Sequence, residues 1–147
     1  MSNYTQILYQ IVFATKYRQT TLIKSGRPKL FSYIHGILTN KNCHVYQING
    51  VEDHLHILTD LHPTLSLSSL IKDIKVASNL YIKESNLFPN FKGWQQGYSA
   101  FTYSYRDKDN LIKYIKNQEE HHKTVIYNDE LYNLLKEHEI DYDEKYI

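Results

Sequence analysis

Strand-like and helix-like patterns follow one another along this chain in an order that few folds accommodate. Residues 6–15 are rich in β-branched and aromatic side chains, which is typical of a buried strand. From Pro28 onward apolar residues recur at helical spacing, and proline is favoured in a first helical turn. Residues 43–49 and 53–61 predict two further strands, and Asn49-Gly50 between them is a turn signal.

The second half of the chain continues with a helix and a strand. Apolar positions within residues 67–81 trace one face of a second helix, and residues 97–105 predict a fourth strand. Asp107 or Asp109 is the expected N-cap of a third helix over residues 110–123.

The predicted order is therefore βαββαβ followed by helices, the last of them a short one at residues 129–138. This order is typical of an α+β ferredoxin-like sandwich, in which two helices cover one face of an antiparallel sheet. We expect the other face to be free for a site. A chain of 147 residues suits one domain, residues 1–147.

Several classes of protein are disfavoured by composition. The chain has no run of eighteen apolar residues and no N-terminal signal-peptide pattern, so we expect a cytoplasmic protein without a membrane span. Cys43 is the only cysteine, which excludes an internal disulfide and a zinc site built from several thiolates.

The net charge of +1 conceals an uneven distribution of charge along the chain. Residues 1–51 carry six basic and no acidic side chains, whereas residues 129–147 carry seven acidic and two basic ones. The basic part could meet the phosphates of a nucleic acid, or both parts could be ordinary solvated surface. Charge alone leaves both interpretations open.

The sequence DHLHILTDL places two histidines on one side of a strand. Side chains alternate across a strand, so His54 and His56 share one face while Leu55 and Ile57 serve the core on the other. Two neighbouring imidazoles can hold one divalent ion. Two solvent-facing histidines on an amphipathic strand would give the same pattern.

A second group of candidate residues lies on the third predicted helix. Tyr114 and Gln118 are four residues apart and share a helical face, so Gln118 could offer an oxygen ligand to the same ion beside the Tyr114 hydroxyl. His121 and His122 are expected at the surface or in supporting positions rather than as ligands. If the strand is regular through residue 53, Asp53 is expected on the opposite face from His54, with a supporting role at most.

The motifs resemble those of one family over nearly the whole chain. DHLHIL followed by YIKNQEEHH resembles the single-tyrosine HUH transposases of small insertion sequences that move as single-stranded DNA; their relatives include REP-associated tyrosine transposases. VFATKYR, SLSSLIKDIK, WQQGYSAFTYS and the closing DEKYI extend the resemblance.

The resemblance implies a DNA transposase that cleaves and rejoins single-stranded DNA at hairpin-marked element ends. Tyr114 would be the nucleophile and form a 5′-phosphotyrosine intermediate, and His54, His56 and Gln118 would hold Mg²⁺ or Mn²⁺. It also implies a homodimer, in which Tyr114 can act in trans, working on DNA in a bacterial or archaeal cytoplasm. The residue that takes the proton of Tyr114 is not identified.

We expect four basic residues to contact DNA phosphates. They are Lys16 and Arg18 of the TKYR segment, and Lys72 and Lys75 on the side of the second helix predicted to be exposed.

Three alternatives remain open at this stage. A domesticated relative could act as a REP-associated or relaxase-like nickase with the same chemistry. A non-catalytic module of the RNA-recognition type shares the βαββαβ order and stacks bases on aromatic side chains of its sheet. A metal-dependent hydrolase would use the histidines without a covalent step on tyrosine.

Overall fold

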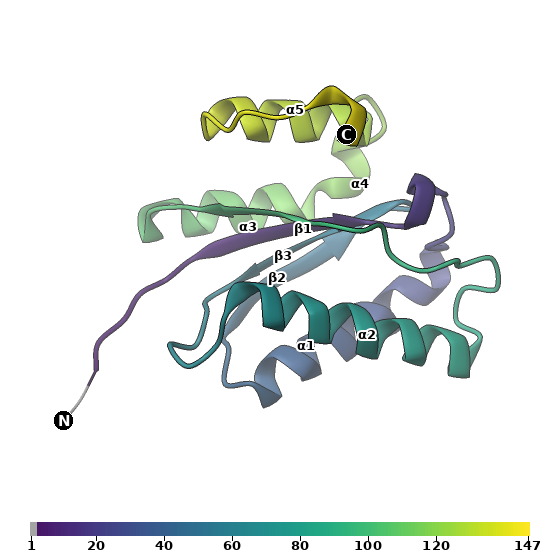
Figure 1. The fold of residues 1–147 in the computed structure, drawn as a ribbon, viewed down its shortest axis with the longest axis horizontal. Helices are drawn as coiled ribbons and strands as arrows, with labels where there is room; N and C mark the ends of the chain where they lie inside the picture. Colours follow the sequence, from purple (N-terminus) through teal and green to yellow (C-terminus); the bar gives the residue numbers. More distant parts are fainter. Residues whose placement is uncertain (1–2) are drawn as a thin grey trace.

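The computed structural model describes residues 3–147 and has a four-stranded antiparallel sheet at its centre (Figure 1). The strands are β1 (Tyr9–Ala14), β2 (Val45–Gly50), β3 (His54–Thr59) and β4 (Ser99–Thr102). Their order across the sheet is β2-β3-β1-β4, with β1 between β3 and β4. This is the arrangement expected of a βαββαβ sandwich, and the predicted α+β fold is confirmed.

Helices α1 (Arg27–Asn40) and α2 (Leu67–Ser85) cover one face of the sheet (Figure 1). The larger apolar core lies between these helices and the sheet, and Ile11, Leu55 and Ile57 are the strand residues at its centre. The helices contribute the fully buried apolar side chains Leu30, Ile34, Leu38, Leu70, Ile71 and Ile74. These positions recur at helical spacing, as the sequence pattern predicts.

The opposite face of the sheet is covered as well, so the prediction of a free face was wrong. Helices α3 (Lys108–Lys116), α4 (Gln118–His121) and α5 (Tyr127–Glu137) lie over it (Figure 1). The reason is a second set of apolar side chains on this face. Leu58 packs with Ile115 of α3, and Val12 and Phe101 pack with α5. Leaving these side chains in water would cost the free energy of apolar exposure.

Element boundaries differ from the predicted ones in two informative places. The helix predicted over residues 110–123 is interrupted at Asn117, which separates α3 from α4. Asn49 and Gly50 belong to β2 and do not form the turn, which lies at residues 51–53. A side chain at Gly50 would collide with the carbonyl oxygen of His54, so glycine is needed there for close approach and not for turning the chain.

Short 3-10 helices complete the structure. They are η1 (Lys16–Arg18), η2 (Lys24–Gly26), η3 (Tyr105–Asp107) and η4 (Glu144–Tyr146). Within residues 3–147, no helix is both long enough and apolar enough to cross a membrane.

Ile57 tests the importance of the larger core. Its side chain is fully buried against α1 and α2, so Ile57→Ala should lower the free energy of unfolding by about 2–5 kcal/mol. Val76→Ala on α2 is the control, because Val76 is 54% exposed and its loss should change stability by less than about 0.5 kcal/mol. Urea denaturation followed by circular dichroism measures both values; equal losses would contradict this description of the core.

Candidate active site

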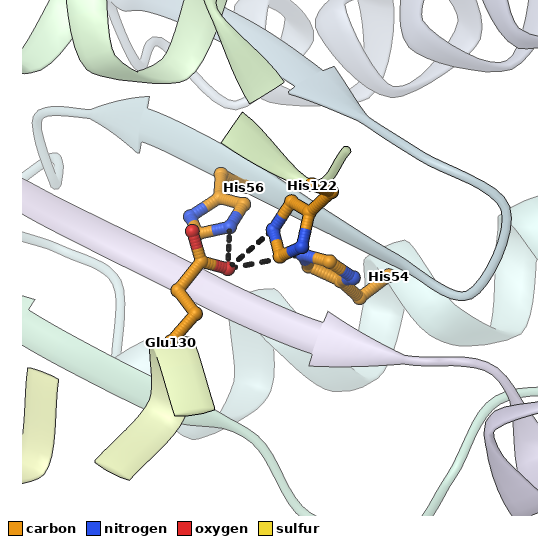
Figure 2. Close-up of side chains that lie close together, drawn as sticks. All are labelled: His54, His56, His122 and Glu130. Carbon is orange, nitrogen blue, oxygen red and sulfur yellow. Dashed lines mark hydrogen bonds and ion pairs between the residues drawn. The ribbon is translucent and has the colours of Figure 1, made fainter. Parts of the chain in front are cut away.

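Three histidines converge on one carboxylate oxygen at the face of the sheet that α3, α4 and α5 cover. Glu130 Oε1 lies 3.1 Å from Nε2 of His54, 3.0 Å from Nε2 of His56 and 3.0 Å from Nε2 of His122 (Figure 2). The histidines of β3 are fully buried, and Glu130 on α5 is 2% exposed. One ligand atom from each of these four residues lies within 4.8 Å of the others, so the group can hold a metal ion.

The second nitrogen of each imidazole also faces an oxygen. The three pairs are His54 Nδ1 with Asp53 Oδ1 at 2.7 Å, His56 Nδ1 with Gln10 Oε1 at 2.7 Å, and His122 Nδ1 with the Val125 carbonyl oxygen at 2.5 Å. Oxygen partners of this kind orient imidazoles that bind metals. The rings are therefore fixed with Nε2 directed toward the centre of the group.

Asp53 is closer to the site than strand alternation predicts. The alternation rule placed its side chain on the opposite face, but β3 begins at His54 and Asp53 belongs to the preceding bend. Because Asp53 lies outside the strand, strand alternation does not fix the direction of its side chain, and its carboxylate contacts the ring of His54. The supporting role expected for Asp53 fits this contact, although the predicted direction of its side chain was wrong.

Tyr114 and Gln118 reach the same carboxylate from the helices over this face. The Tyr114 hydroxyl donates a hydrogen bond to Glu130 Oε2, and Gln118 Nε2 donates to the same oxygen at 3.1 Å. Gln118 is fully buried, and its Oε1 has no hydrogen-bond partner among residues 3–147. A buried amide oxygen without a partner is costly, and a cation is one group that would satisfy it.

The break in the helix at Asn117 is held by a side chain of the sheet. Asn49 Nδ2 donates to the carbonyl oxygens of Ile115, at 3.0 Å, and Lys116, at 3.1 Å. These carbonyls lie in the last turn of α3, where a helix runs out of the regular donors of its next turn. Asn49 therefore fastens the end of α3 to β2, between the residues that carry the candidate tyrosine and amide.

A buried arginine fastens the next helix. Arg27 donates to the Leu22 carbonyl oxygen and forms ion pairs with Glu52, at 3.0 Å, and with Glu119 of α4, at 3.3 Å. Its side chain is 5% exposed. Arg27 is one of the six basic residues within residues 1–51. It positions α4 and does not add to a surface that could contact phosphates.

Sequence reasoning missed Glu130 altogether and assigned His122 to a supporting position. Glu130 lies in the acidic final stretch, which suggested solvated surface. A local signal did exist, because Glu130 precedes the buried Leu134 by four residues and so shares its helical face. His122 lies just beyond α4, and its local pattern gave no comparable signal.

Burial and hydrogen bonding act against each other on the ionisable groups. Burial alone would raise the pKa of Glu130, but hydrogen bonds from His122, His54 and His56 hold it well below its usual range. Burial also opposes protonation of His54, yet Asp53 and Glu130 raise its pKa. Burial lowers the pKa of His56, and Glu130 only partly compensates.

The hydroxyl of Tyr114 is held in its protonated form. Burial, the negative charge of Glu130 and the hydrogen bond to that carboxylate all raise the pKa of Tyr114. The phenol is therefore a weak nucleophile in this environment, and positive charge nearby is needed to make it more acidic.

Arg18 approaches the site through an aromatic ring, whereas Lys16 is exposed and its amine lies 5.5 Å from the ring centre of Tyr17. The guanidinium of Arg18 lies 6.0 Å from the ring centre of Tyr127, and that ring lies 4.5 Å from the ring of His54. Arg18 also donates to the Ile147 carbonyl oxygen at 2.6 Å. Burial raises the pKa of Tyr127 to about 12, although Arg18 opposes this shift.

The two lysines of α2 do not share an exposed side as predicted. Lys72 is exposed, but Lys75 is half-buried and its amine donates to the carbonyl oxygens of Gln95, at 2.9 Å, and Gly97, at 2.5 Å. Burial lowers the pKa of Lys75. Through these two hydrogen bonds its amine ties the segment before β4 to α2. Both lysines lie on the face of the sheet opposite the histidines (Figure 1).

A cavity of about 420 Å³ adjoins Tyr114 between α3 and α5. Its lining includes the carboxylates of Asp107, Glu130 and Glu137, together with Tyr103 and His121. A phosphate entering here would meet negative charge, so a bound cation would favour its approach.

Comparison with known proteins gives consistent matches. Residues 3–118 match the family described as "Transposase IS200 like". The transposases for insertion sequence element IS200 of Salmonella typhimurium (strain LT2) and Salmonella typhi are each 29% identical over 120 residues, which cover 78% of this chain and 78% of theirs.

Two solved structures share the fold. A Deinococcus radiodurans R1 protein assigned as a transposase has a TM-score of 0.63 and 23% identity, over 80% of this chain and 95% of its own. A REP-associated tyrosine transposase bound to a REP hairpin has a TM-score of 0.63 and 16% identity, over 85% of this chain and 76% of its own. At these identities the two structures support the fold alone.

The contact of Asn49 with the end of α3 can be tested by mutation. Asn49→Ala removes one part-buried and one exposed hydrogen bond to the end of α3, so the free energy of unfolding should fall by about 1 kcal/mol. Amides of residues 114–118 should also exchange with deuterium faster. Gln47→Ala on the same strand is the control, because within residues 3–147 its amide makes a single long bond, of 3.4 Å, to Ile48. Unchanged exchange at residues 114–118 would contradict the anchoring role.

Proposed function

This chain belongs to the family of IS200-like transposases, and on that basis we propose that it cleaves and rejoins single-stranded DNA through a covalent bond to Tyr114. One observation carries this proposal. The Tyr114 hydroxyl and the imidazoles of His54 and His56 meet at the two oxygens of a single buried carboxylate, Glu130. A nucleophile is thus held beside a group that can bind a metal, and the two together can carry out metal-assisted phosphodiester transesterification.

The proposed step is a displacement at phosphorus. The Tyr114 oxygen bonds to the scissile phosphate as the bond to the 3′ oxygen breaks, which leaves a 5′-phosphotyrosine and a free 3′-hydroxyl. The phenol proton is released to water, because Glu130 Oε2 accepts its hydrogen bond but has a pKa too low to keep the proton, and the departing 3′ oxygen takes up a proton from solvent. Attack by a 3′-hydroxyl reverses the step and joins strands without another energy source.

His54, His56 and Gln118 are the proposed holders of a divalent cation, Mg²⁺ or Mn²⁺, as the family resemblance implies. The buried Oε1 of Gln118, which lacks a hydrogen-bond partner within residues 3–147, supports a fit to a cation. Rotating the side-chain amide of Gln118 by half a turn would exchange the positions of Nε2 and Oε1, so that Oε1 would then face Glu130. When bound, such a cation would supply positive charge that polarises the phosphodiester and makes the phenol more acidic.

Hairpin-marked DNA is the proposed substrate. The structural relative with 16% identity was solved with a REP hairpin, which supports a hairpin as the DNA feature recognised by this chain. Lys16 and Arg18 are proposed phosphate contacts, and Arg18 is the one placed near the site, because it packs against Tyr127 beside His54. Lys72 is exposed on α2, across the sheet from the histidines, and is a proposed phosphate contact farther from the site. The amine of Lys75 already donates to two carbonyl oxygens.

A domesticated nickase would use the same chemistry and differs only in its DNA target. A module of the RNA-recognition type is disfavoured, because such modules stack bases on an exposed sheet face and here helices cover both faces. A hydrolase without a covalent step differs in leaving no DNA attached to the protein.

The covalent step predicts the effect of removing one hydroxyl. Tyr114→Phe should reduce formation of a covalent protein–DNA adduct by at least about 1,000-fold, since it removes the only proposed nucleophile. Tyr105→Phe is the matched control, because this exposed tyrosine of η3 makes no contact with the histidines and should leave adduct formation unchanged.

The measurement is a denaturing gel with labelled single-stranded DNA that carries the hairpins flanking the gene, in the presence of Mg²⁺ or Mn²⁺. DNA binding by Tyr114→Phe, followed by fluorescence anisotropy, should stay within about twofold of the parent. Normal cleavage by Tyr114→Phe would exclude the covalent mechanism. Cleavage by the parent without any adduct would identify a hydrolase instead.

The arrangement within one chain predicts the result of mixing variants. Tyr114 and the histidine pair meet here in the same chain, so we propose that each copy uses its own tyrosine even within a homodimer. A mixture of Tyr114→Phe and His56→Ala subunits should then form no adduct. Recovery of about a quarter or more of parental activity would show instead that α3 is exchanged between two copies, with Tyr114 acting in trans.

A further inference from the structure

The residues around Glu130 Oε1 form a richer set of donors than the family resemblance implies. We propose that His122 and Glu130 complete, with His54 and His56, a site of three imidazoles and one carboxylate that selects a divalent transition-metal cation such as Mn²⁺, Co²⁺ or Zn²⁺ over Mg²⁺. This ligand set differs from the implied one, in which Gln118 is the third ligand. It names the metal of the proposed active site and so rests on the proposed function, but it is tested without DNA.

The first argument is convergence from distant parts of the chain. His54 and His56 come from β3, His122 follows α4, and Glu130 belongs to α5. Their ligand atoms nevertheless lie within 4.8 Å of one another, and Glu130 Oε1 is 3.0–3.1 Å from each Nε2. Both additional residues lie beyond residues 3–118, the part of the chain that matches the family.

The second argument comes from counting donors and acceptors. Both nitrogens of each of the three rings face an oxygen, yet a neutral imidazole has only one N–H to donate. Without a cation, either three imidazoliums crowd together in a buried site or lone pairs of nitrogen and oxygen oppose each other. One divalent cation removes this conflict, because the Nδ1 atoms keep their protons and the three Nε2 lone pairs bind the ion.

His121 shows that this arrangement is specific to certain histidines. It is adjacent to His122 in sequence and its Nε2 lies 3.3 Å from Glu130 Oε2, but it makes no hydrogen bond there. No hydrogen bond orients its ring within the described part of the chain, and its side chain is 28% exposed. His121 is therefore a natural control for His122.

The nature of the ligand atoms sets the class of metal. Imidazole nitrogen suits zinc and other first-row transition metals, whereas Mg²⁺ prefers oxygen ligands and retains several waters. Three nitrogens and one carboxylate oxygen in a mostly buried group thus favour a transition metal.

Glu130 would connect the metal with the nucleophile. Its Oε1 faces the three imidazoles, while its Oε2 accepts hydrogen bonds from Tyr114 and Gln118. Gln118 thus positions the carboxylate of Glu130 through Oε2, the oxygen that does not face the three imidazoles. It need not coordinate the ion when DNA is absent. Loss of Gln118 should accordingly weaken ion binding less than loss of His122.

The test is titration of the metal-free protein with Co²⁺, followed by visible absorption, with no DNA present. His122→Ala and Glu130→Gln should each weaken Co²⁺ binding by at least about 10-fold, and His121→Ala should stay within about twofold. A roughly 100-fold excess of Mg²⁺ should not displace Co²⁺. X-ray absorption of the zinc-loaded parent protein, which requires no variant to fold, should give three imidazole ligands.

Either of two results would overturn the proposal. One is parental Co²⁺ affinity in both His122→Ala and Glu130→Gln, with Gln118→Ala losing affinity instead. The other is two imidazoles in the absorption spectrum, or displacement of Co²⁺ by Mg²⁺. The DNA adduct assay reports on the proposed function separately: a protein with the expected Co²⁺ site and no adduct would refute the covalent mechanism alone.

Discussion

The candidate site depends on the hydrogen bonds made by one buried carboxylate, that of Glu130. A carboxylate that is 2% exposed is tolerated only when hydrogen bonds and opposite charge offset its desolvation. Here the partners are His54, His56, His122, Tyr114 and Gln118. They come from β3, α3, α4 and the segment after α4, so one side chain of α5 fixes how all these parts meet.

The two faces of the sheet have different roles, since one forms most of the apolar core and the other carries the candidate site. The face under α1 and α2 is apolar and supplies most of the buried hydrophobic area. The other face carries the histidines between two smaller apolar clusters, which hold α3 and α5 in place. Because alternate side chains of β3 serve both faces, the strand that anchors the core also fixes the imidazoles. A site on such a strand is held more rigidly than one on loops.

Charge is used locally, and the net value says little about it. The basic first third of the chain uses part of its charge within the molecule, since Arg27 binds α4 and Lys41 pairs with Asp73. Arg18 instead reaches the neighbourhood of His54 through Tyr127. The acidic last stretch supplies Glu130 to the site and carboxylates to the adjoining cavity. The overall net charge therefore says less about the candidate site than the positions of these few side chains do.

The sequence by itself determined the order of elements, the antiparallel sheet and the pairing of His54 with His56 on one face, because each follows from a local period of two or 3.6 residues. It also predicted a common helical side for Tyr114 and Gln118, but the helix ends between them and both meet at Glu130 Oε2. Only the tertiary structure decided that Glu130 meets His54 and His56, at sequence separations of 76 and 74 residues. Contacts over such separations are set by how α5 packs on Val12 and Phe101, and no local pattern encodes that packing.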